Sequence, residues 1–361
     1  MTKPIRLAKQ SRTGTNNLPV VNLSALSHSD IRVQQRAARE IGEIAETTGF
    51  LYLAQHGIDP HLVDRVYRQS SLFFAQSDQE KQRYYVGHSK NHRGYVPTTE
   101  KGSYDDEVGP RRYEAFDMAL DLPEDDTDYL SGNPLLGPNV WPTLQNFRRD
   151  LSEYYAEMRR LERVMCYAFE LYLGISPGYF QKFMQRPVSQ LRLIHYLPAT
   201  TPAEDIDVNM GAHTDYECFT ILHSYTDGLE ILDLNNQWIK APPIENTFYF
   251  NIGDMLEVWS NGRFKSTPHR VVNFEERYSI PYFAATDFDA VINPLVDLDA
   301  EAKISRKIKY QPIVAGQHLL GQMLRDFPYL NRRFQSGDLN VSGVTPGQNP
   351  FEARIRSVRT T

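Results

Sequence analysis

The amino-acid sequence predicts an α+β fold in which N-terminal helices and one long supporting helix surround a jelly-roll β core. Three patterns lead to this prediction. Apolar residues recur at helical spacing in two segments near the N-terminus. The same spacing continues over a longer segment, residues 143–173. From residue 188 to 288 the chain changes to short runs rich in β-branched and aromatic residues, separated by Gly, Asp, Asn and Pro.

The first predicted elements alternate between strand and helix. Residues 18–23 (LPVVNL) and 50–53 (FLYL) each predict a short strand. Between them, Asp30 is a suitable N-cap for a helix that runs to about Thr48. A second helix is expected to begin at Asp59-Pro60, because Asp caps a helix and Pro is favoured at the first helical position.

The middle of the chain combines an irregular segment with the long helix. Residues 84–136 are rich in Gly, Pro and Asp and enclose one strand-like run, residues 113–118. In the helix predicted for residues 143–173, one face carries a regular apolar stripe. Such a stripe is more typical of a helix packed on a core than of a ligand site.

Eight short runs after Pro187 predict the β core, and this number of short strands is typical of a jelly roll. The runs are Leu191–Leu197, Cys218–Tyr225, Gly228–Leu232, Trp238–Ala241, Thr247–Ile252, Met255–Trp259, Arg270–Asn273 and Ser279–Ala284. Residues 301–327 predict a helix together with a basic segment. The expected organisation is a flexible leader (1–17), an N-terminal mixed helical region (18–186), the β core (187–290) and a C-terminal helix and tail (291–361).

Composition narrows the class of protein. The 361 residues are 41% hydrophobic with a net charge of −6, and acidic and basic residues are mixed, which disfavours a nucleic-acid partner. No apolar run is long enough for a membrane span or a signal peptide. Cys166 and Cys218 are the only cysteines, so a disulfide framework is not expected. We expect a cytoplasmic, soluble enzyme, either a monomer or a homodimer.

One His-x-Asp pair in the β-rich region is a candidate metal site. Residues two apart on a strand point to the same side, so His213 and Asp215 are expected to face one point. His269 lies on a later strand that a barrel can bring alongside. Two His and one carboxylate on one face of a metal suit iron(II) and oxygen chemistry. Alone the pair is a weak motif, since a solvent-facing His beside an acidic turn, or a metal other than iron, fits equally well.

A basic residue shortly after His269 adds a candidate anion site. Arg277 and Ser279 are expected to project from one side of a strand, where a guanidinium and a hydroxyl can grip a carboxylate. Tyr196, on an earlier predicted strand, is a candidate for a further hydroxyl contact. The alternative is that Arg277 is a surface charge beside Glu275 and Glu276.

Together these segments resemble the isopenicillin N synthase-like branch of the 2-oxoglutarate/iron(II)-dependent dioxygenases. The resemblance covers about residues 18–290. It rests on residues 18–23 (LPVVNL), 49–58 (GFLYLAQHGI), 73–74 (FF) with 80–81 (EK), 93–95 (RGY), 191–198 (LRLIHYLP) and 251–254 (NIGD). The separation between His269 and Arg277 is shorter than in plant members, and HYLPA replaces YYPPC at residues 195–199. A plant hormone or flavonoid substrate is therefore not expected.

The resemblance implies both the fold and the chemistry. It implies that the jelly roll is a double-stranded β-helix and that His213, Asp215 and His269 are the iron(II) ligands. It implies that Arg277 and Ser279, helped by Tyr196, bind 2-oxoglutarate. The expected reaction is oxidation, usually hydroxylation, of an unactivated C–H bond in a small molecule, with O2 consumed and succinate and CO2 released. Residues 251–253 are expected to form a tight turn between strands.

Position along the chain suggests where the substrate binds. The candidates for the substrate wall are Arg111, Arg112, Tyr113, Phe116, Phe283 and Phe288. Ordinary loop or core packing is an equally good interpretation of each. Two other functions remain open at this point. One is an oxidase like isopenicillin N synthase, in which the substrate's own carboxylate replaces 2-oxoglutarate. The other is a ligand-binding barrel without enzymatic activity.

Overall fold

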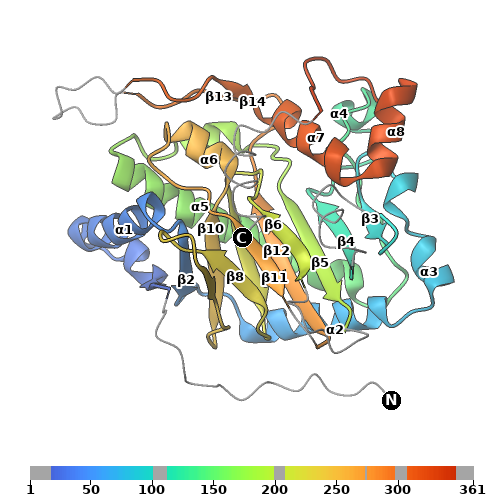
Figure 1. Cartoon of the computed structure of the whole chain (residues 1–361), viewed down its shortest axis with the longest axis horizontal. Coiled ribbons are helices and arrows are strands. Elements are labelled where there is room, and N and C mark those ends of the chain that lie inside the picture. The colour runs from blue at the N-terminus through green and yellow to red at the C-terminus, as the bar shows by residue number, and fades with distance from the viewer. Residues whose placement is uncertain (1–17, 101–111, 199–207, 273–274, 297–306, 347–361) are drawn as a thin grey trace.

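Two β-sheets face each other at the centre of the computed structural model, which describes residues 18–100, 112–198, 208–272, 275–296 and 307–346 (Figure 1). The larger sheet has eight strands in the order β1-β2-β10-β7-β12-β5-β4-β3, and the smaller has four in the order β6-β11-β8-β9. Apolar residues of β2 and β10 pack against β8 of the smaller sheet. This pair of facing sheets is the jelly-roll core that the sequence predicts.

The strands of the two sheets cover most of the expected β runs. The larger sheet contains β1 (Val20–Asn22), β2 (Phe50–Ala54), β3 (Gly94–Val96), β4 (Tyr113–Ala119), β5 (Gln190–Tyr196), β7 (Phe219–Ser224), β10 (Thr247–Ile252) and β12 (Arg277–Ala284). The smaller contains β6 (Val208–His213), β8 (Leu229–Leu232), β9 (Trp238–Lys240) and β11 (His269–Val272), and β13 (Val291–Ile292) pairs with β14 (Ile313–Val314) elsewhere. Strand β6 was not among the eight predicted runs.

In the sequence, the helices come before the β core, within it and after it. They are α1 (Ile31–Glu46), α2 (Pro60–Phe74), α3 (Asp78–Gln82), α4 (Thr127–Leu130), α5 (Phe147–Leu173), α6 (Asp254–Trp259), α7 (Ala315–Asp326) and α8 (Pro328–Ser336). Three short 3-10 turns cover Leu23–Ser27, Val86–His88 and Phe180–Phe183. The predicted caps are confirmed, since the side chains of Asp30 and Asp59 accept hydrogen bonds from the backbone N–H groups of Arg32 and His61.

Helix α5 supports the larger sheet from behind (Figure 1). The ring of Phe169 on α5 lies 6.2 Å from Phe219 on β7 and 5.9 Å from Phe250 on β10. Tyr155, earlier on the same helix, stands edge-on to Tyr282 of β12. The stripe of apolar residues on this helix is thus part of the core, as its helical spacing predicts.

One predicted strand is wrong. The structure shows residues 255–259 inside helix α6, every residue of which is buried. A short apolar run that is buried on all sides has no alternation to separate a strand from a helix. The backbone decides the outcome here, because the N–H of Asp254 donates to the carbonyl of Asp215 at 2.8 Å and the chain turns into a helix.

The alternation of side chains along each strand gives the larger sheet two different faces. On β10, Phe248 and Phe250 belong to the apolar core, whereas Tyr249 and Asn251 line a cavity between the sheets. Strands β7 and β12 divide their residues in the same way, so one face packs in the apolar core and the other carries residues that line the cavity.

The C-terminal helices α7 and α8 lie together at one end of the sheets, beside β4 and β5 (Figure 1). Of the segment predicted to contain a helix and a basic run, residues 301–306 lie outside the described part, and the helix begins at Ala315. The predicted leader, residues 1–17, also lies outside it. Among the described residues, no helix combines the length and the apolar character that crossing a membrane requires.

Candidate active site

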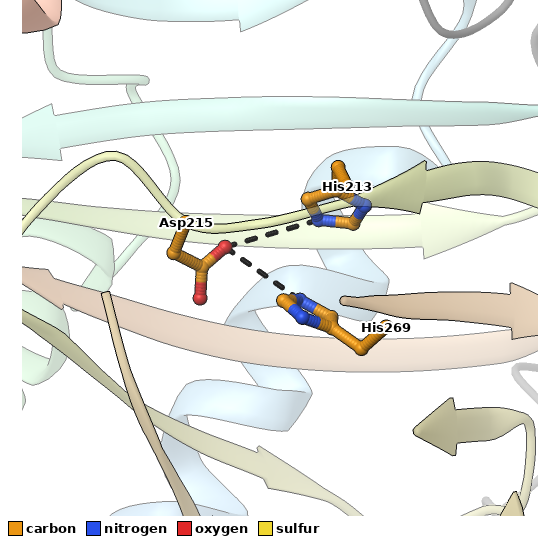
Figure 2. Close-up of side chains that lie close together, drawn as sticks. All are labelled: His213, Asp215 and His269. Atoms are coloured by element: carbon orange, nitrogen blue, oxygen red, sulfur yellow. Dashed lines mark ion pairs between the residues drawn. The ribbon is translucent and has the colours of Figure 1, made fainter. Parts of the chain in front are cut away.

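Three potential metal ligands meet between the two sheets. His213 is the last residue of β6 and His269 the first of β11, and antiparallel pairing of these strands puts the two histidines directly opposite each other. Oδ1 of Asp215 lies 3.8 Å from Nε2 of His213 and 3.6 Å from Nε2 of His269. Figure 2 shows the carboxylate and both rings turned toward a common point. The potential ligand atoms all lie within 4.8 Å of one another, close enough for one ion.

The backbone fixes which nitrogen each histidine presents. Nδ1 of His213 lies 2.9 Å from the carbonyl oxygen of Gly211, and Nδ1 of His269 lies 3.2 Å from that of Thr267. A carbonyl oxygen only accepts hydrogen bonds, so each Nδ1 carries a proton and each Nε2 keeps a lone pair for a metal. The two Nε2 atoms with their lone pairs are therefore the ring nitrogens that lie near Asp215.

The geometric reason given for Asp215 in the sequence analysis is wrong. Strand β6 ends at His213, and Asp215 lies in the irregular segment that follows, so the two side chains are not related by strand alternation. Instead, Oδ2 of Asp215 accepts hydrogen bonds from the hydroxyl of Thr220 and, at 2.6 Å, from Nδ2 of Asn251. With Oδ2 held by these contacts, Oδ1 is the oxygen that faces the two histidines.

The charge of Asp215 is supported by its neighbours. Burial opposes ionisation, but the interaction with His269 and His213, which is attractive when these rings are protonated, and the hydrogen bonds from Thr220 and Asn251 outweigh it. The pKa of Asp215 is therefore lowered from its ordinary value. An ionised carboxylate beside two imidazole lone pairs is a donor set that suits iron(II).

Residues 251–253 were expected to form a tight turn between strands, and this prediction is wrong, because the segment joins strand β10 to helix α6. Asn251 in this segment also contacts a candidate metal ligand. Gly253 allows close backbone approach, since a Cβ at this position would lie 2.3 Å from the carbonyl oxygen of Glu217. A polar Asn inside a fully buried strand was the available sign that residue 251 belongs to the site.

Replacing Asn251 with alanine is expected to weaken iron(II) binding by about 10- to 100-fold, because the carboxylate of Asp215 loses a hydrogen bond that orients it. Anaerobic titration with iron(II) measures the change. Asn236→Ala, in an exposed turn, is the matched control. Unchanged affinity in a folded Asn251 variant would show that Thr220 orients Asp215 without help.

A second set of polar residues lies on strand β12 of the larger sheet. Arg277, the first residue of β12, is 2% exposed, and Ser279 is fully buried. Arg277 is paired across the sheet with Tyr196, and its guanidinium carbon lies 4.8 Å from the centre of that ring. Within the described part of the chain, Nε and Nη1 of Arg277 and Oγ of Ser279 have no hydrogen-bond partner. The surface-charge interpretation of Arg277 does not agree with this burial.

Unpartnered donors of this kind indicate a ligand. A buried guanidinium without a counter-charge is strongly unfavourable, whereas an anion that accepts its hydrogen bonds removes the penalty. Arg277 and Tyr196 line the same cavity as the three potential metal ligands. The donor set therefore fits a carboxylate-bearing ligand whose other end reaches the metal.

The cavity has a third wall, of which the sequence analysis indicated only Phe283. It continues past the histidines to residues of β5, β12 and the C-terminal helix α7, and this outer part is called the substrate end below. Its residues are Gln190, Arg192, Glu217, Phe283, Leu319, Met323, Asp326 and Phe327. Burial and the nearby charge of Asp215 raise the pKa of Glu217 to about 8, and a positive charge placed there would lower it again.

The predicted substrate residues are spread over several environments. Phe283 lines the cavity. Tyr113 is buried with its ring 5.6 Å from that of Tyr196, and Phe116 packs among core rings, 4.8 Å from Phe73. Among the described residues, Arg112, Tyr113, Phe116 and Phe288 do not line this cavity. Phe288 packs against Gly316 at the start of α7, and Arg111 lies outside the described residues.

Arg192 at the substrate end is held from behind by a buried carboxylate. Its Nε and Nη2 donate to the two oxygens of Asp117 at 2.6 and 2.9 Å. Asp117 is fully buried, and Nε2 of His92 also lies 3.3 Å from it. Burial alone would raise the pKa of Asp117, but Arg192 and His92 hold it well below its ordinary value of 3.8.

Asp117→Asn is expected to lower the free energy of unfolding by about 3–5 kcal/mol at neutral pH, because it removes the fully buried carboxylate that pairs with the partly buried Arg192. The folded-state pKa of Asp117 is depressed, so its stabilisation is present above its unfolded value of about 3.9 and is lost as the pH falls toward the folded value. The difference between variant and wild type should shrink below that pH. Urea unfolding across pH measures it, with the exposed Asp125→Asn as control; a pH-independent difference would contradict the assignment.

The fold and the site together define a class of protein, a jelly-roll oxygenase with a two-histidine, one-carboxylate metal site and a buried anion anchor. Two family models match the chain. One describes the N-terminal domain of a non-haem dioxygenase in morphine synthesis (residues 18–144), and the other the 2OG-Fe(II) oxygenase superfamily (residues 187–286). The chain belongs to this family, in its isopenicillin N synthase-like branch.

Individual relatives agree with the family. The chain is 32% identical to homoarginine-6-hydroxylase 2-ODD-C23 of Glycine max, over 87% of the chain and 98% of that protein. It is 33% identical to the 2-oxoglutarate-dependent dioxygenase citB of Monascus ruber, over 77% and 87%. The structure matches that of a full-length Neurospora crassa protein in complex with alpha-KG with a TM-score of 0.72 and 27% identity, over 85% and 96%.

A putative 2OG-Fe(II) oxygenase family protein from Caulobacter crescentus matches with a TM-score of 0.72 and 30% identity, over 86% of this chain and 99% of that one. The chain is thus a 2-oxoglutarate-dependent dioxygenase that acts on a small molecule, with iron(II), 2-oxoglutarate and O2 as its cofactor and cosubstrates. These relatives favour this function over the oxidase that uses no 2-oxoglutarate.

Proposed function

We propose that His213, Asp215 and His269 hold the iron and that Arg277 and Ser279 hold the distal carboxylate of 2-oxoglutarate, with Tyr196 beside them. The observation that carries the assignment is the set of unpartnered buried donors on Arg277 and Ser279, seen within the described residues, beside a cavity that also contains the His-Asp-His group. Without an anion these donors would be an unexplained cost to folding.

The reaction we propose is hydroxylation of an unactivated C–H bond. When bound, iron(II) and 2-oxoglutarate supply the oxidising power by coupling O2 reduction to release of succinate and CO2. The protein binds and orients the cosubstrate and the target C–H bond. Arg277 and Ser279 fix one end of the cosubstrate, and the substrate end of the cavity holds the target C–H bond near the metal ligands.

The walls around the site exclude water from the reacting groups. Ile194, Leu222 and Val271 are apolar residues that line the cavity from both sheets. Ring contacts help to hold the metal ligands, since Phe50 stands edge-on to His269 at 5.4 Å. An apolar surround strengthens the electrostatic contact between Arg277 and a carboxylate, and it protects a reactive oxidant from solvent.

The experiment that tests the assignment measures 2-oxoglutarate binding and turnover together. Protein loaded anaerobically with iron(II) should bind 2-oxoglutarate, and exposure to O2 should form succinate and CO2 in equal amounts as O2 is consumed. O2 consumption without succinate would instead favour the oxidase, in which Arg277 and Ser279 hold a substrate carboxylate. Absence of both metal binding and turnover would favour a ligand-binding barrel.

The relatives limit the range of substrates to test first. Homoarginine is the substrate named for relatives from soybean, rice and Arabidopsis, and thymine is bound together with alpha-KG in one structure of the Neurospora crassa protein. Both are small nitrogen-bearing compounds, so we propose that such compounds form the first panel. The cytoplasmic location, the lack of a nucleic-acid partner, the state of monomer or homodimer and the four-part division of the chain stay predictions.

A further inference from the structure

The amide group of Gln190 lies at the substrate end of the cavity. Gln190 is the first residue of β5 and lines the cavity there. Its Nε2 atom is buried, and among the described residues no hydrogen-bond acceptor pairs with it, whereas Oε1 of the same amide is not left in this state. A buried NH2 group without a partner disfavours the folded protein unless a ligand accepts its hydrogen bonds.

Strand pairing puts an aromatic ring beside this amide. Gln190 and Phe283 are directly opposite each other in the antiparallel pairing of β5 and β12. Opposite residues project from the same face of a sheet with Cβ atoms about 5 Å apart. Both side chains line the cavity. A ligand group that reaches the amide of Gln190 therefore lies close to the ring of Phe283 as well.

The next residue on this face of β5 is held by the protein itself. Side chains alternate along a strand, so Arg192 projects to the same side as Gln190, and it also lines the cavity. Nε and Nη2 of Arg192 donate to Asp117, and its guanidinium carbon lies 5.5 Å from the centre of the Phe327 ring. These contacts fix Arg192 as a wall of the cavity. The amide nitrogen of Gln190 has no comparable partner among the described residues.

An amide NH2 group matches a neutral acceptor. It donates two hydrogen bonds and carries no charge, so a carbonyl oxygen satisfies it fully. A buried carboxylate, in contrast, is costly unless a charged group pairs with it. The charged donors of Arg277 suit the carboxylate of the cosubstrate in this cavity, and the neutral amide of Gln190 suits the oxygen of a ketone, an amide or a lactam.

We propose that Gln190 is a specificity-determining residue and that the substrate is a neutral carbonyl compound, whose C=O oxygen accepts a hydrogen bond from Nε2 of Gln190. The hydrocarbon part beside this carbonyl packs on the ring of Phe283. The inference rests on the proposed function, since it assigns the substrate of that same cavity. A hydrogen bond and an apolar contact together fix the orientation of the substrate, which decides the C–H bond that is oxidised.

The two residues are expected to act on different properties of a ligand. Gln190 distinguishes a carbonyl compound from a hydrocarbon of the same shape, and one neutral hydrogen bond changes affinity by about three- to tenfold. Phe283 contacts apolar surface that both compounds have in common. Replacing Gln190 should therefore change the ratio of the two affinities, whereas replacing Phe283 should change both affinities together.

Ligand-observed NMR on the full chain tests this. The protein is loaded with zinc(II) in place of iron(II) and saturated with 2-oxoglutarate, so that binding is measured without turnover. Acetophenone is compared with α-methylstyrene, and cyclohexanone with methylenecyclohexane, because each pair replaces C=O by C=CH2 at nearly constant shape. The hydrocarbons bind any apolar surface more readily, so the quantity compared between proteins is the ratio of the two affinities in a pair. For at least one pair, Gln190→Met should lower the ratio of carbonyl to hydrocarbon affinity by about three- to tenfold.

Further variants locate the effect. Gln190→Glu keeps the shape of the side chain, replaces its NH2 group by an oxygen and should lower the ratio in the same direction. Phe283→Leu should weaken both members of a pair and leave their ratio unchanged. Gln79→Met, at an exposed position on α3, is the matched control and should change neither affinity. Binding of zinc(II) and 2-oxoglutarate is measured for every variant, so a misfolded protein is recognised.

A direct measurement on the wild-type protein needs no folded variant for its result. After selective 15N labelling of glutamine, the side-chain NH2 signal that is absent from the Gln190 variants is followed during titration. It should shift further with acetophenone than with α-methylstyrene, because only the ketone accepts a hydrogen bond from it.

The outcomes separate this inference from the proposed function. Failure of the wild-type protein to bind metal and 2-oxoglutarate would contradict the proposed function itself. Normal binding of both, with no binding of either carbonyl compound, with an unchanged ratio in the folded Gln190 variants or with no shift of the NH2 signal, would overturn the inference alone. Benzoate that lost more affinity than acetophenone in Gln190→Met would also overturn it, because the group bound at Gln190 would then be an anion.

Discussion

Replacing His269 with alanine is expected to lower succinate formation by a factor on the order of 10³ and to prevent the protein from retaining iron(II). His269 presents Nε2 to the same point as Asp215, 3.6 Å away, and Nδ1 is already committed to the carbonyl of Thr267. Among the described residues, His213, Asp215 and His269 are the group identified as able to hold a metal ion, so no neighbour there is positioned to replace the lost ligand. Metal content after anaerobic loading and the rate of succinate formation measure the two effects.

The control for this variant is another histidine. His61→Ala removes an exposed imidazole from the first turn of α2 and should leave metal content and turnover unchanged. A His269 variant that binds iron(II) as tightly as the wild type and turns over 2-oxoglutarate would remove His269 from the metal site. The histidine on β6 would then need a partner other than the one that the sheet pairing places opposite it.

Arg277→Leu is expected to raise the KM for 2-oxoglutarate by about 100-fold, because a buried charged contact to a carboxylate contributes about 2–5 kcal/mol to binding. The free energy of unfolding of the ligand-free protein should not fall, and it should rise if leucine fills the same space. The reason is that the guanidinium is buried with Nε and Nη1 unpartnered among the described residues, and an apolar residue removes that penalty.

Measuring both the KM for 2-oxoglutarate and the free energy of unfolding distinguishes an arginine that binds the cosubstrate from one that stabilises the fold. A structural arginine would lower the stability on replacement and leave the KM for 2-oxoglutarate nearly unchanged. Ser279→Ala is the graded comparison, since it removes one neutral hydroxyl and should raise the KM by about tenfold at most. Steady-state kinetics in 2-oxoglutarate and urea unfolding of the ligand-free protein provide both measurements.

Local patterns predicted most of the elements correctly. Asp30 and Asp59 cap helices where the sequence places them, because a cap depends on residues within one turn. The long apolar stripe of α5 is a core stripe for the same reason, since helical spacing is a local property. Helix α6 was mistaken for a strand because its buried apolar residues show neither period, and the hydrogen bond from Asp254 to Asp215 that begins it joins residues far apart in sequence.

The candidate active site shows the same difference between what local patterns predict and what contacts between distant residues decide. The sequence indicated all three potential metal ligands, but the reason given for Asp215 was wrong, since it lies beyond the end of β6. What turns Asp215 toward the histidines is Asn251 from β10 together with Thr220 from β7, and no spacing along the chain relates these residues. The substrate wall was sought in residues 111–116 and 283–288, whereas the structure also brings in α7 from the C-terminal part.

By itself, the sequence determined the class of fold and the family, and it indicated the residues that we propose hold iron and 2-oxoglutarate. The fold and the family follow from short motifs and from spacings within single strands and helices. Only the tertiary structure decided which atoms face the metal position, that Arg277 is buried with donors left for a ligand, and that Asp326 joins Glu217 at the substrate end. The physical reason is that orientation, burial and the balance of charge in a cavity depend on contacts between distant segments, which no local pattern contains.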